Sequence, residues 1–397
     1  MVKFKKNVII ATIITIIIFA LFTYKNISEI PDTLYVKKSV ETSAIKVSNN
    51  IFIKDNKENN KLKLKLFGII PIKTVKLSKI EDIKVYPGGT AIGIKLSTEG
   101  VLVVGYSDIN TFDDRGKIES PAKEQGMLIG DVIVKINNKE IANSVDFVSM
   151  VRSIDKEIIE VEFIRDNIIY NKSLSLGKEE DGYKLGLWIR DSTAGIGTLT
   201  FYHKESNTYG ALGHPITDGD TNEPFLIKDG DILDATIMKV RRGEKGLPGE
   251  LKGLFNNENI SLGSINKNTN SGIYGEVEKD IICEKYNEPL SIALRNEIIE
   301  GPAEIITTID DNGPGKYSVE IIKILPQDEA GPKSMVIKVT DEKLLEKTGG
   351  IVQGMSGSPI IQNDKIIGAV THVLVNKPEV GYGIYIEWML QDSDIIE

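Results

Sequence analysis

A serine framed by glycines, in residues 354–359 (GMSGSP), is the part of this chain whose residue types most directly permit chemistry. Glycine lets the backbone turn tightly, so the N–H groups near Gly354 and Ser356 can point at one spot and stabilise an oxyanion there. Gly357 leaves room at the serine oxygen for a substrate carbonyl. Because a serine hydroxyl is a weak nucleophile by itself, this interpretation requires a base that takes its proton.

Only three histidines can supply that base. His214 lies between a glycine and a proline, in a segment too broken for a helix, whereas His203 lies in a polar stretch typical of a solvated turn. His372 follows an apolar strand-like run and is interpreted as a strand-end histidine, with a second functional histidine as the alternative. We expect His214 to be the base; the alternative is a histidine that only caps a turn.

A carboxylate is also needed, to accept a hydrogen bond from the far nitrogen of the imidazole and fix its tautomer. Sequence spacing does not choose among the aspartates, because such groups are assembled in space. Asp341 ends a strand-like run at residues 334–340, where a side chain can be held rigidly, whereas acidic residues in turns are more often solvated. The candidates are Asp218, Asp220, Asp310, Asp311, Asp341 and Asp364.

Three segments occur in a fixed order along the chain: residues 186–201 (GLWIRDSTAGIGTLTF), residues 209–218 (YGALGHPITD) and residues 354–359. The last is similar to the Gly-x-Ser-Gly-x-Pro pattern around the nucleophile of chymotrypsin-like serine peptidases. Together the three segments resemble the stage IV sporulation protein B peptidase family of endospore-forming bacteria.

The resemblance implies a serine endopeptidase whose catalytic triad is His214, Asp341 and Ser356, with the backbone N–H groups of Gly354 and Ser356 as the oxyanion hole. It implies a protein substrate, the regulatory subunit of an intramembrane metalloprotease complex, whose cleavage leads to release of a late sporulation sigma factor. It also implies self-cleavage near the N-terminus, and a location in the space between forespore and mother cell.

Composition is that of an ordinary globular protein with two or three domains: 397 residues, 41% hydrophobic and 26% charged. The net charge of −9, with no basic block in the part after residue 25, argues against nucleic acid as a partner. The single cysteine, Cys283, excludes an intrachain disulfide. No Cys/His cluster has metal-ligand spacing, so we expect no metal and no other cofactor.

Residues 1–25 are expected to be a membrane anchor. Lys3, Lys5 and Lys6 precede an uncharged, mostly apolar stretch that is about long enough to span a bilayer. Lysines on the inner side predict that the rest of the chain lies outside the cytoplasm. Residues 26–85 are expected to form a linker and a small β module, since residues 61–66 (KLKLKL) alternate with the period of a half-buried strand.

The middle of the chain has the pattern of a PDZ domain. Residues 92–96 (IGIKL) resemble its carboxylate-binding loop, and residues 120–137 resemble its short helix, glycine turn and strand. Ile92, Gly93 and Ile94 are then expected to bind the C-terminus of a peptide, or a segment of the same chain, that adds as a strand. The alternative is a PDZ fold that packs as a spacer with its groove blocked.

From residue 185 onward, strand-like runs separated by glycine-rich turns favour a β-barrel or sandwich. The predicted fold is therefore mainly β, with a PDZ domain over residues 86–178 and a chymotrypsin-like double β-barrel peptidase domain over residues 180–397. Two other interpretations are a catalytically silent PDZ signalling receptor or scaffold, and a quality-control protease of the high-temperature-requirement type. The latter places its protease before its PDZ domain, and the reversed order here disfavours it.

Overall fold

The predicted transmembrane anchor is not found among the described residues of the N-terminal stretch. The computed structural model describes residues 10, 12–15, 17–21, 23–24, 27, 30–39, 53–58, 60–110, 116–180, 182–327 and 329–396. Within these residues no helix is both long and apolar enough to cross a bilayer, which overturns the anchor predicted at residues 1–25. Lys3, Lys5 and Lys6 lie outside the described residues.

A small four-stranded sheet follows, in the order β1-β4-β3-β2. Leu62 and Leu64 are buried in its core and Lys61, Lys63 and Lys65 are not, as the alternating sequence predicted. Its first strand also reaches the body of the molecule, because Tyr35 belongs to the largest core and Lys37 donates to the carbonyl of Ile292. The strands are β1 (Thr33–Lys37), β2 (Ile53–Glu58), β3 (Lys61–Leu66) and β4 (Ile70–Ile80).

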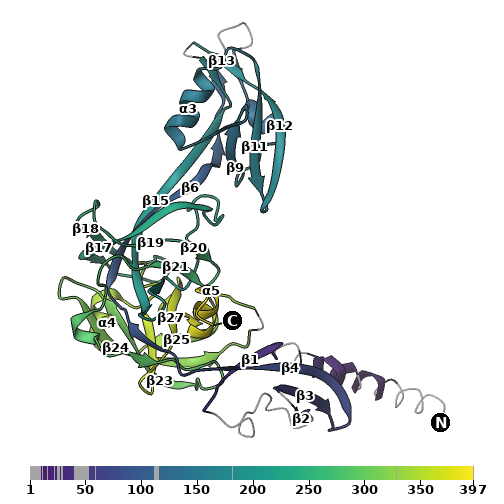
Figure 1. Ribbon diagram of the computed structural model, residues 1–397, viewed down its shortest axis with the longest axis vertical. Helices are drawn as coiled ribbons and strands as arrows, with labels where there is room; N and C mark the ends of the chain where they lie inside the picture. The colour runs from purple at the N-terminus through teal and green to yellow at the C-terminus, as the bar shows by residue number, and fades with distance from the viewer. Residues whose placement is uncertain are drawn as a thin grey trace.

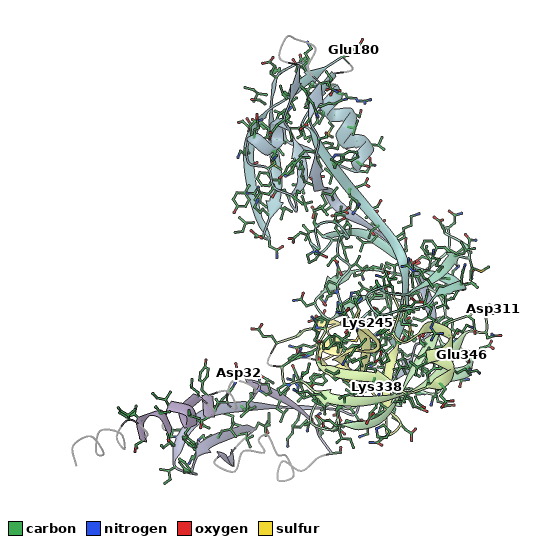
Figure 2. The ribbon with its side chains drawn as sticks, turned by 180° about the vertical axis from the view of Figure 1, so that it is seen from behind. Asp32, Glu180, Lys245, Asp311, Lys338 and Glu346 are labelled. Carbon is green, nitrogen blue, oxygen red and sulfur yellow. The ribbon has the colours of Figure 1, made fainter. Side chains whose placement is uncertain are left out.

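Two long antiparallel strands, β6 (Ala91–Tyr106) and β15 (Leu187–His203), organise the next part of the molecule. They pair from Leu187 opposite Tyr106 down to Thr198 opposite Ala91, so one end of the pair lies in an outlying unit and the other in the body (Figure 1). The sequence predicted a PDZ domain over residues 86–178, and after that prediction we call the outlying unit, residues 99–190, the PDZ-like unit. Figure 2 shows Glu180 at its far tip.

The PDZ-like unit has its own apolar core, which includes Val101, Ile133, Phe147 and Val161. Ser120 caps its short helix α2 and Asn143 caps α3, each by accepting a hydrogen bond from a backbone N–H in the first turn. Its other elements are β7 (Ile109–Asn110), β8 (Lys117–Ile118), α2 (Pro121–Glu124), β9 (Val132–Ile136), β10 (Lys139–Glu140), α3 (Ser144–Arg152), β11 (Ile158–Arg165), β12 (Ile168–Ser175), β13 (Gly177–Glu179) and β14 (Gly182–Lys184).

The predicted carboxylate-binding loop is not a loop. Ile92, Gly93 and Ile94 lie inside β6, where β15 pairs with one edge of the strand and β17 with the other. Because both edges are occupied, no peptide can add as a strand at this place, and the ring of Phe255 covers Gly93. This part of the prediction is corrected.

The ends of β6 and β15 that lie in the body, residues 91–98 and 192–203, belong to a strongly curved sheet. We call this sheet the first barrel. β17 pairs with β6, β16 pairs with β15, and a bridge between Gly263 and Val277 brings β19 to the end of β21. Its elements are β5 (Lys84–Pro87), β16 (Thr208–Ala211), β17 (Ile227–Arg241), β18 (Glu250–Phe255), β19 (Ser261–Ser264), β20 (Lys267–Thr269), β21 (Gly272–Glu276), a 3-10 helix (Glu284–Tyr286) and β22 (Leu290–Ser291).

The C-terminal part is a closed barrel in the order β23-β24-β25-β28-β27-β26. Its interior is aliphatic and merges with the largest core of the molecule. Figure 2 labels Lys338, in β25 of this barrel, and Glu346, in α4. The elements are β23 (Gly301–Thr308), β24 (Pro314–Ile324), β25 (Met335–Val339), α4 (Glu342–Thr348), β26 (Pro359–Gln362), β27 (Lys365–Leu374), β28 (Lys377–Tyr385) and α5 (Ile386–Asp392). The prediction of a mainly β protein is confirmed.

Candidate active site

A cleft of about 650 Å³ lies where the two barrels meet, and it contains both Ser356 and His214. One wall is β15 of the first barrel, and the opposite wall includes Thr371 and His372 of β27. Two side chains that are 142 residues apart in the sequence, 356 − 214, are thus brought into one cavity.

The loop that carries Ser356 is shaped by glycine. Gly354 and Gly357 have φ of 96° and 97°, values in the left-handed region that residues with a Cβ rarely adopt. A Cβ at position 357 would also lie 2.0 Å from the carbonyl oxygen of Thr198. The glycine after the serine is therefore required because the backbone of β15 approaches it closely. The Ser356 hydroxyl donates to the carbonyl oxygen of Thr371 at 2.7 Å.

β15 holds this loop from the other barrel through three hydrogen bonds. The N–H of Thr198 donates to the carbonyl oxygen of Ser356 at 3.0 Å, and its Oγ1 donates to the carbonyl oxygen of Gly354 at 2.7 Å. Oγ1 of Thr200 donates to the carbonyl oxygen of Gly357 at 2.7 Å. Both threonines are buried, so solvent does not compete for these bonds. The position of Ser356 thus depends on the first barrel.

The two predicted oxyanion-hole donors are unused within the loop. The N–H of Met355 donates to Val352 and the N–H of Gly357 donates to Val370. In the described part of the chain, the N–H groups of Gly354 and Ser356 have no hydrogen-bond acceptor. They are therefore available to a developing negative charge, as an oxyanion hole requires.

His214 follows a strained turn and is held as a neutral ring. Leu212 and Gly213 both have positive φ, 69° and 71°, and for a leucine this costs of order 1–3 kcal/mol. Nδ1 of His214 lies 2.8 Å from the carbonyl oxygen of Pro215, so Nδ1 carries the proton and Nε2 has its lone pair free. Burial lowers the pKa of His214, which favours the neutral form that a general base needs.

His372 lies beside this base. The centroids of the two imidazole rings are 5.0 Å apart and the rings are tilted by 47°. Burial lowers the pKa of His372 to about 4, helped by His214 once that ring is protonated at low pH and by the positive charge of Lys333. Near neutral pH both rings are therefore uncharged. Sequence reasoning offered a second functional histidine only as an alternative.

Comparison with known families identifies the chain. The sequence model of the SpoIVB peptidase S55 family matches residues 181–390, more than half of the chain. The chain belongs to this family. It is accordingly a serine peptidase of the SpoIVB type.

No curated protein matches this S55 peptidase. Among solved structures, it is similar to the PDZ domain of an SdrC-like protein from Listeria monocytogenes, with 18% identity and a TM-score of 0.18 over 23% of this chain and 87% of that one. It is also similar to the active form of the Rv3671c protease from M. tuberculosis, with 12% identity and a TM-score of 0.27 over 50% of this chain and 74% of that one.

The structure does not bring Asp341 to the cleft of this S55 peptidase. Asp341 caps α4, where Oδ1 accepts from the N–H of Leu344 at 2.9 Å and Oδ2 accepts from the N–H of Ser318 at 3.4 Å. Pro332, just before β25, lines the cleft, and the strand then runs about 13 Å before Asp341 is reached. The triad role of Asp341 stays a prediction from the resemblance.

Asp218, the carboxylate nearest to His214 in the sequence, is also engaged elsewhere. Burial alone would raise the pKa of Asp218, but hydrogen bonds from the N–H groups of Thr221 and Asp220 and from Arg190 lower it below its usual value. Arg190 of β15 bonds Asp220 as well, at 2.7 Å. These contacts fix the loop that follows His214 to the base of the PDZ-like unit.

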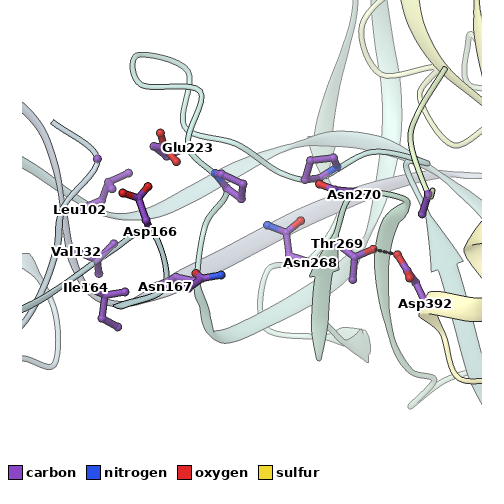
Figure 3. Close-up of a pocket in the computed structure, with 15 residues that line it drawn as sticks. Leu102, Val132, Ile164, Asp166, Asn167, Glu223, Asn268, Thr269, Asn270 and Asp392 are labelled. Atoms are coloured by element: carbon purple, nitrogen blue, oxygen red, sulfur yellow. Dashed lines mark hydrogen bonds between the residues drawn. The ribbon is translucent and has the colours of Figure 1, made fainter. Parts of the chain in front are cut away.

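A second cavity, of about 500 Å³, shares Pro215 and Asn270 with the lining of the cleft and is drawn in Figure 3. Leu102 and Asp166 line it from the PDZ-like unit, Asn268 from the first barrel and Asp392 from α5. Its lining includes neither Ser356 nor His214. In the ranges that the structure describes, no three His, Cys, Asp or Glu residues are grouped as metal ligands.

The functional residues that sequence reasoning missed are Thr198 and Thr200. A signal was present, because two threonines alternate with apolar residues in residues 196–201 (IGTLTF) of a run that looks like a strand. Polar side chains that are buried in a strand need partners. Which partner they bind is visible only in the structure.

Proposed function

We propose that this chain is a signalling endopeptidase of sporulation that cleaves a regulatory subunit of an intramembrane metalloprotease complex, and also cleaves itself. Its site of action is the space between forespore and mother cell, and the consequence of cleavage is processing of a late sigma factor. Family membership supports this proposal, and the observation that carries its chemistry is the placement of Ser356 and His214 in one cleft.

The proposed reaction is acyl transfer. Neutral His214 takes the proton of the Ser356 hydroxyl at Nε2 while Oγ attacks a peptide carbonyl carbon. The N–H groups of Gly354 and Ser356 stabilise the resulting oxyanion, and His214 then gives the proton to the departing amine. Water, activated by the same ring, hydrolyses the acyl-enzyme and regenerates the serine.

The hydrogen bond between Ser356 and Thr371 supports a resting form of the enzyme. The hydroxyl donates to the carbonyl of Thr371, so it must rotate toward His214 before it can lose its proton. The carbonyl of Pro215 orients the His214 ring, which is the role that an aspartate has in the usual triad.

The full chain labelled with a fluorophosphonate probe tests the proposal. We expect the wild type to be labelled and to release self-cleavage fragments, and Ser356→Ala to do neither. Ser358→Ala is the matched control, because Ser358 lies in the same loop but its hydroxyl is buried and donates to the carbonyl of Met355.

Absence of labelling in folded wild type, also after addition of the extracytoplasmic domain of the candidate substrate, would contradict the proposal. It would leave the alternative of a catalytically silent PDZ signalling receptor. Labelling that persists in Ser356→Ala would instead place the nucleophile on another residue.

A further inference from the structure

β15 has one paired edge and one open edge where it passes the cleft. Residues 192–198 pair with β6 along one edge. On the other edge, β16 begins its pairing only at Leu199. Among the described residues, no strand pairs with that edge between Ser192 and Gly197.

The direction of the backbone groups along this edge follows from two hydrogen bonds. The N–H of Leu199 donates to Thr90, on the β6 side, whereas the N–H of Thr198 donates to the carbonyl of Ser356 on the opposite side. Successive residues of a strand point their backbone groups to opposite sides. The N–H and C=O groups of Ala194 and Ile196 therefore point to the same side as those of Thr198, toward the loop that carries the nucleophile.

The open edge is also accessible. Residues 193–196 line the cleft that contains Ser356 and His214. Ala194 and Gly195 are exposed, and a Cβ placed on Gly195 would meet no atom within 4 Å. Small side chains on an open strand edge permit close approach of another backbone, and unpaired N–H and C=O groups attract one.

We propose that the open edge of β15, at residues 192–196, binds an extended segment of the protein substrate as an added strand on one side of the scissile bond. The inference rests on the proposed function and names how that site holds its substrate. The backbone groups of Ala194 and Ile196 pair with the substrate backbone, so recognition at this place depends on an unfolded, extended chain more than on its side chains.

A proline at position 194 tests the inference with little disturbance of the fold. Proline removes the N–H that points into the cleft, and proline is tolerated in strands where the N–H faces outward. Ala194→Ser is the matched control, because it changes the side chain and keeps the N–H. We would measure self-cleavage and kcat/KM on a mixture of synthetic ten-residue peptides, together with fluorophosphonate labelling of Ser356.

The expected result is a loss of about tenfold or more in both cleavage measurements for Ala194→Pro, with labelling by the small probe within about twofold of wild type. Ala194→Ser, which keeps the N–H, should lose clearly less cleavage than Ala194→Pro. Cleavage by Ala194→Pro at the wild-type rate would overturn the inference while leaving the proposed function intact. A wild type that neither labels nor cleaves would overturn both.

A second measurement uses the wild-type enzyme and does not depend on the folding of a variant. The best-cleaved peptide of the mixture is resynthesised with one N-methyl group at each position in turn. An added strand predicts that every second position on one side of the scissile bond is sensitive, because only alternate N–H groups face β15. Uniform sensitivity, or none, would contradict strand addition.

Discussion

Replacement of Thr198 by valine should loosen the loop that carries the nucleophile. Valine has nearly the shape of threonine but no hydroxyl, so the packing around this buried position is kept and the hydrogen bond to the carbonyl of Gly354 is lost. A buried acceptor that loses its donor costs about 1–3 kcal/mol. The N–H of Thr198 still donates to Ser356, so the loop should remain attached and become less well fixed.

The magnitude follows from this loss. If about 1.4 kcal/mol of this cost is added to the activation free energy for reaction of Ser356, the rate of labelling falls about tenfold. We would measure the second-order rate constant for fluorophosphonate labelling and the urea midpoint of unfolding. Thr198→Ser keeps the hydroxyl and serves as the control.

Thr200→Val provides an independent comparison, because it removes a donor to the carbonyl of Gly357 on the other side of the nucleophile. It should have a similar cost in stability. Thr198→Val with wild-type labelling and a wild-type midpoint would refute the argument that β15 positions the loop. Loss of labelling in Thr198→Ser as well would assign the effect to the methyl group instead.

Three further predictions concern the surroundings of the site. Asp341→Asn should keep labelling of Ser356 within about twofold, because asparagine caps a helix about as well as aspartate; a large loss with an intact fold would restore Asp341 as the triad acid. The pKa of His372 is 6.5 in its ordinary range and about 4 in the folded chain, so between these values the unfolded chain binds a proton that the folded chain does not. The wild type therefore loses stability as the pH falls through this window. His372→Gln removes this group and should lose less stability on acidification. Urea midpoints at about pH 7 and about pH 5 check this, and an equal drop in wild type and variant would contradict it. Arg295→Met should cost about 3–5 kcal/mol in urea unfolding, because Glu387 is fully buried and would lose its ionic partner; recovery in Arg295→Met/Glu387→Leu is the control, and a single variant as stable as wild type would count against this account.

The parts of the site that could be predicted are those with a local signal. The glycines around Ser356 reflect positive φ and close approach of β15, and both leave a mark in the sequence. The segment that carries His214 has a similar mark. The small N-terminal sheet was predictable for the same reason, since alternation in residues 61–66 is a property of one strand.

Two site predictions, one of them corrected and one still a prediction, depended on a distant partner or on a choice between local roles. Ile92–Ile94 resemble a binding loop, but β17, which is more than 130 residues further along the chain, completes a sheet around them. Asp341 ends a strand and also precedes residues 342–348 (EKLLEKT), a pattern typical of a helix start. Rigid positioning and helix capping predict the same residue type at this place, so the sequence alone does not separate them.

The pairing of β6 with β15 makes them one long hairpin whose tip is a folded unit. Residues 192–198 line the cleft and include Thr198, which holds the nucleophile loop; they pair with residues 91–97, from which they are separated in the chain by the PDZ-like unit. A flexible connection of that length would impose a large loop-closure entropy, whereas a folded one delivers both ends already side by side. We therefore expect the inserted unit to form before the first barrel closes. Deletion of that unit would therefore remove the connection that brings β6 and β15 together, as well as any regulation by the unit. A loss of activity in such a truncation would first indicate that the peptidase no longer folds.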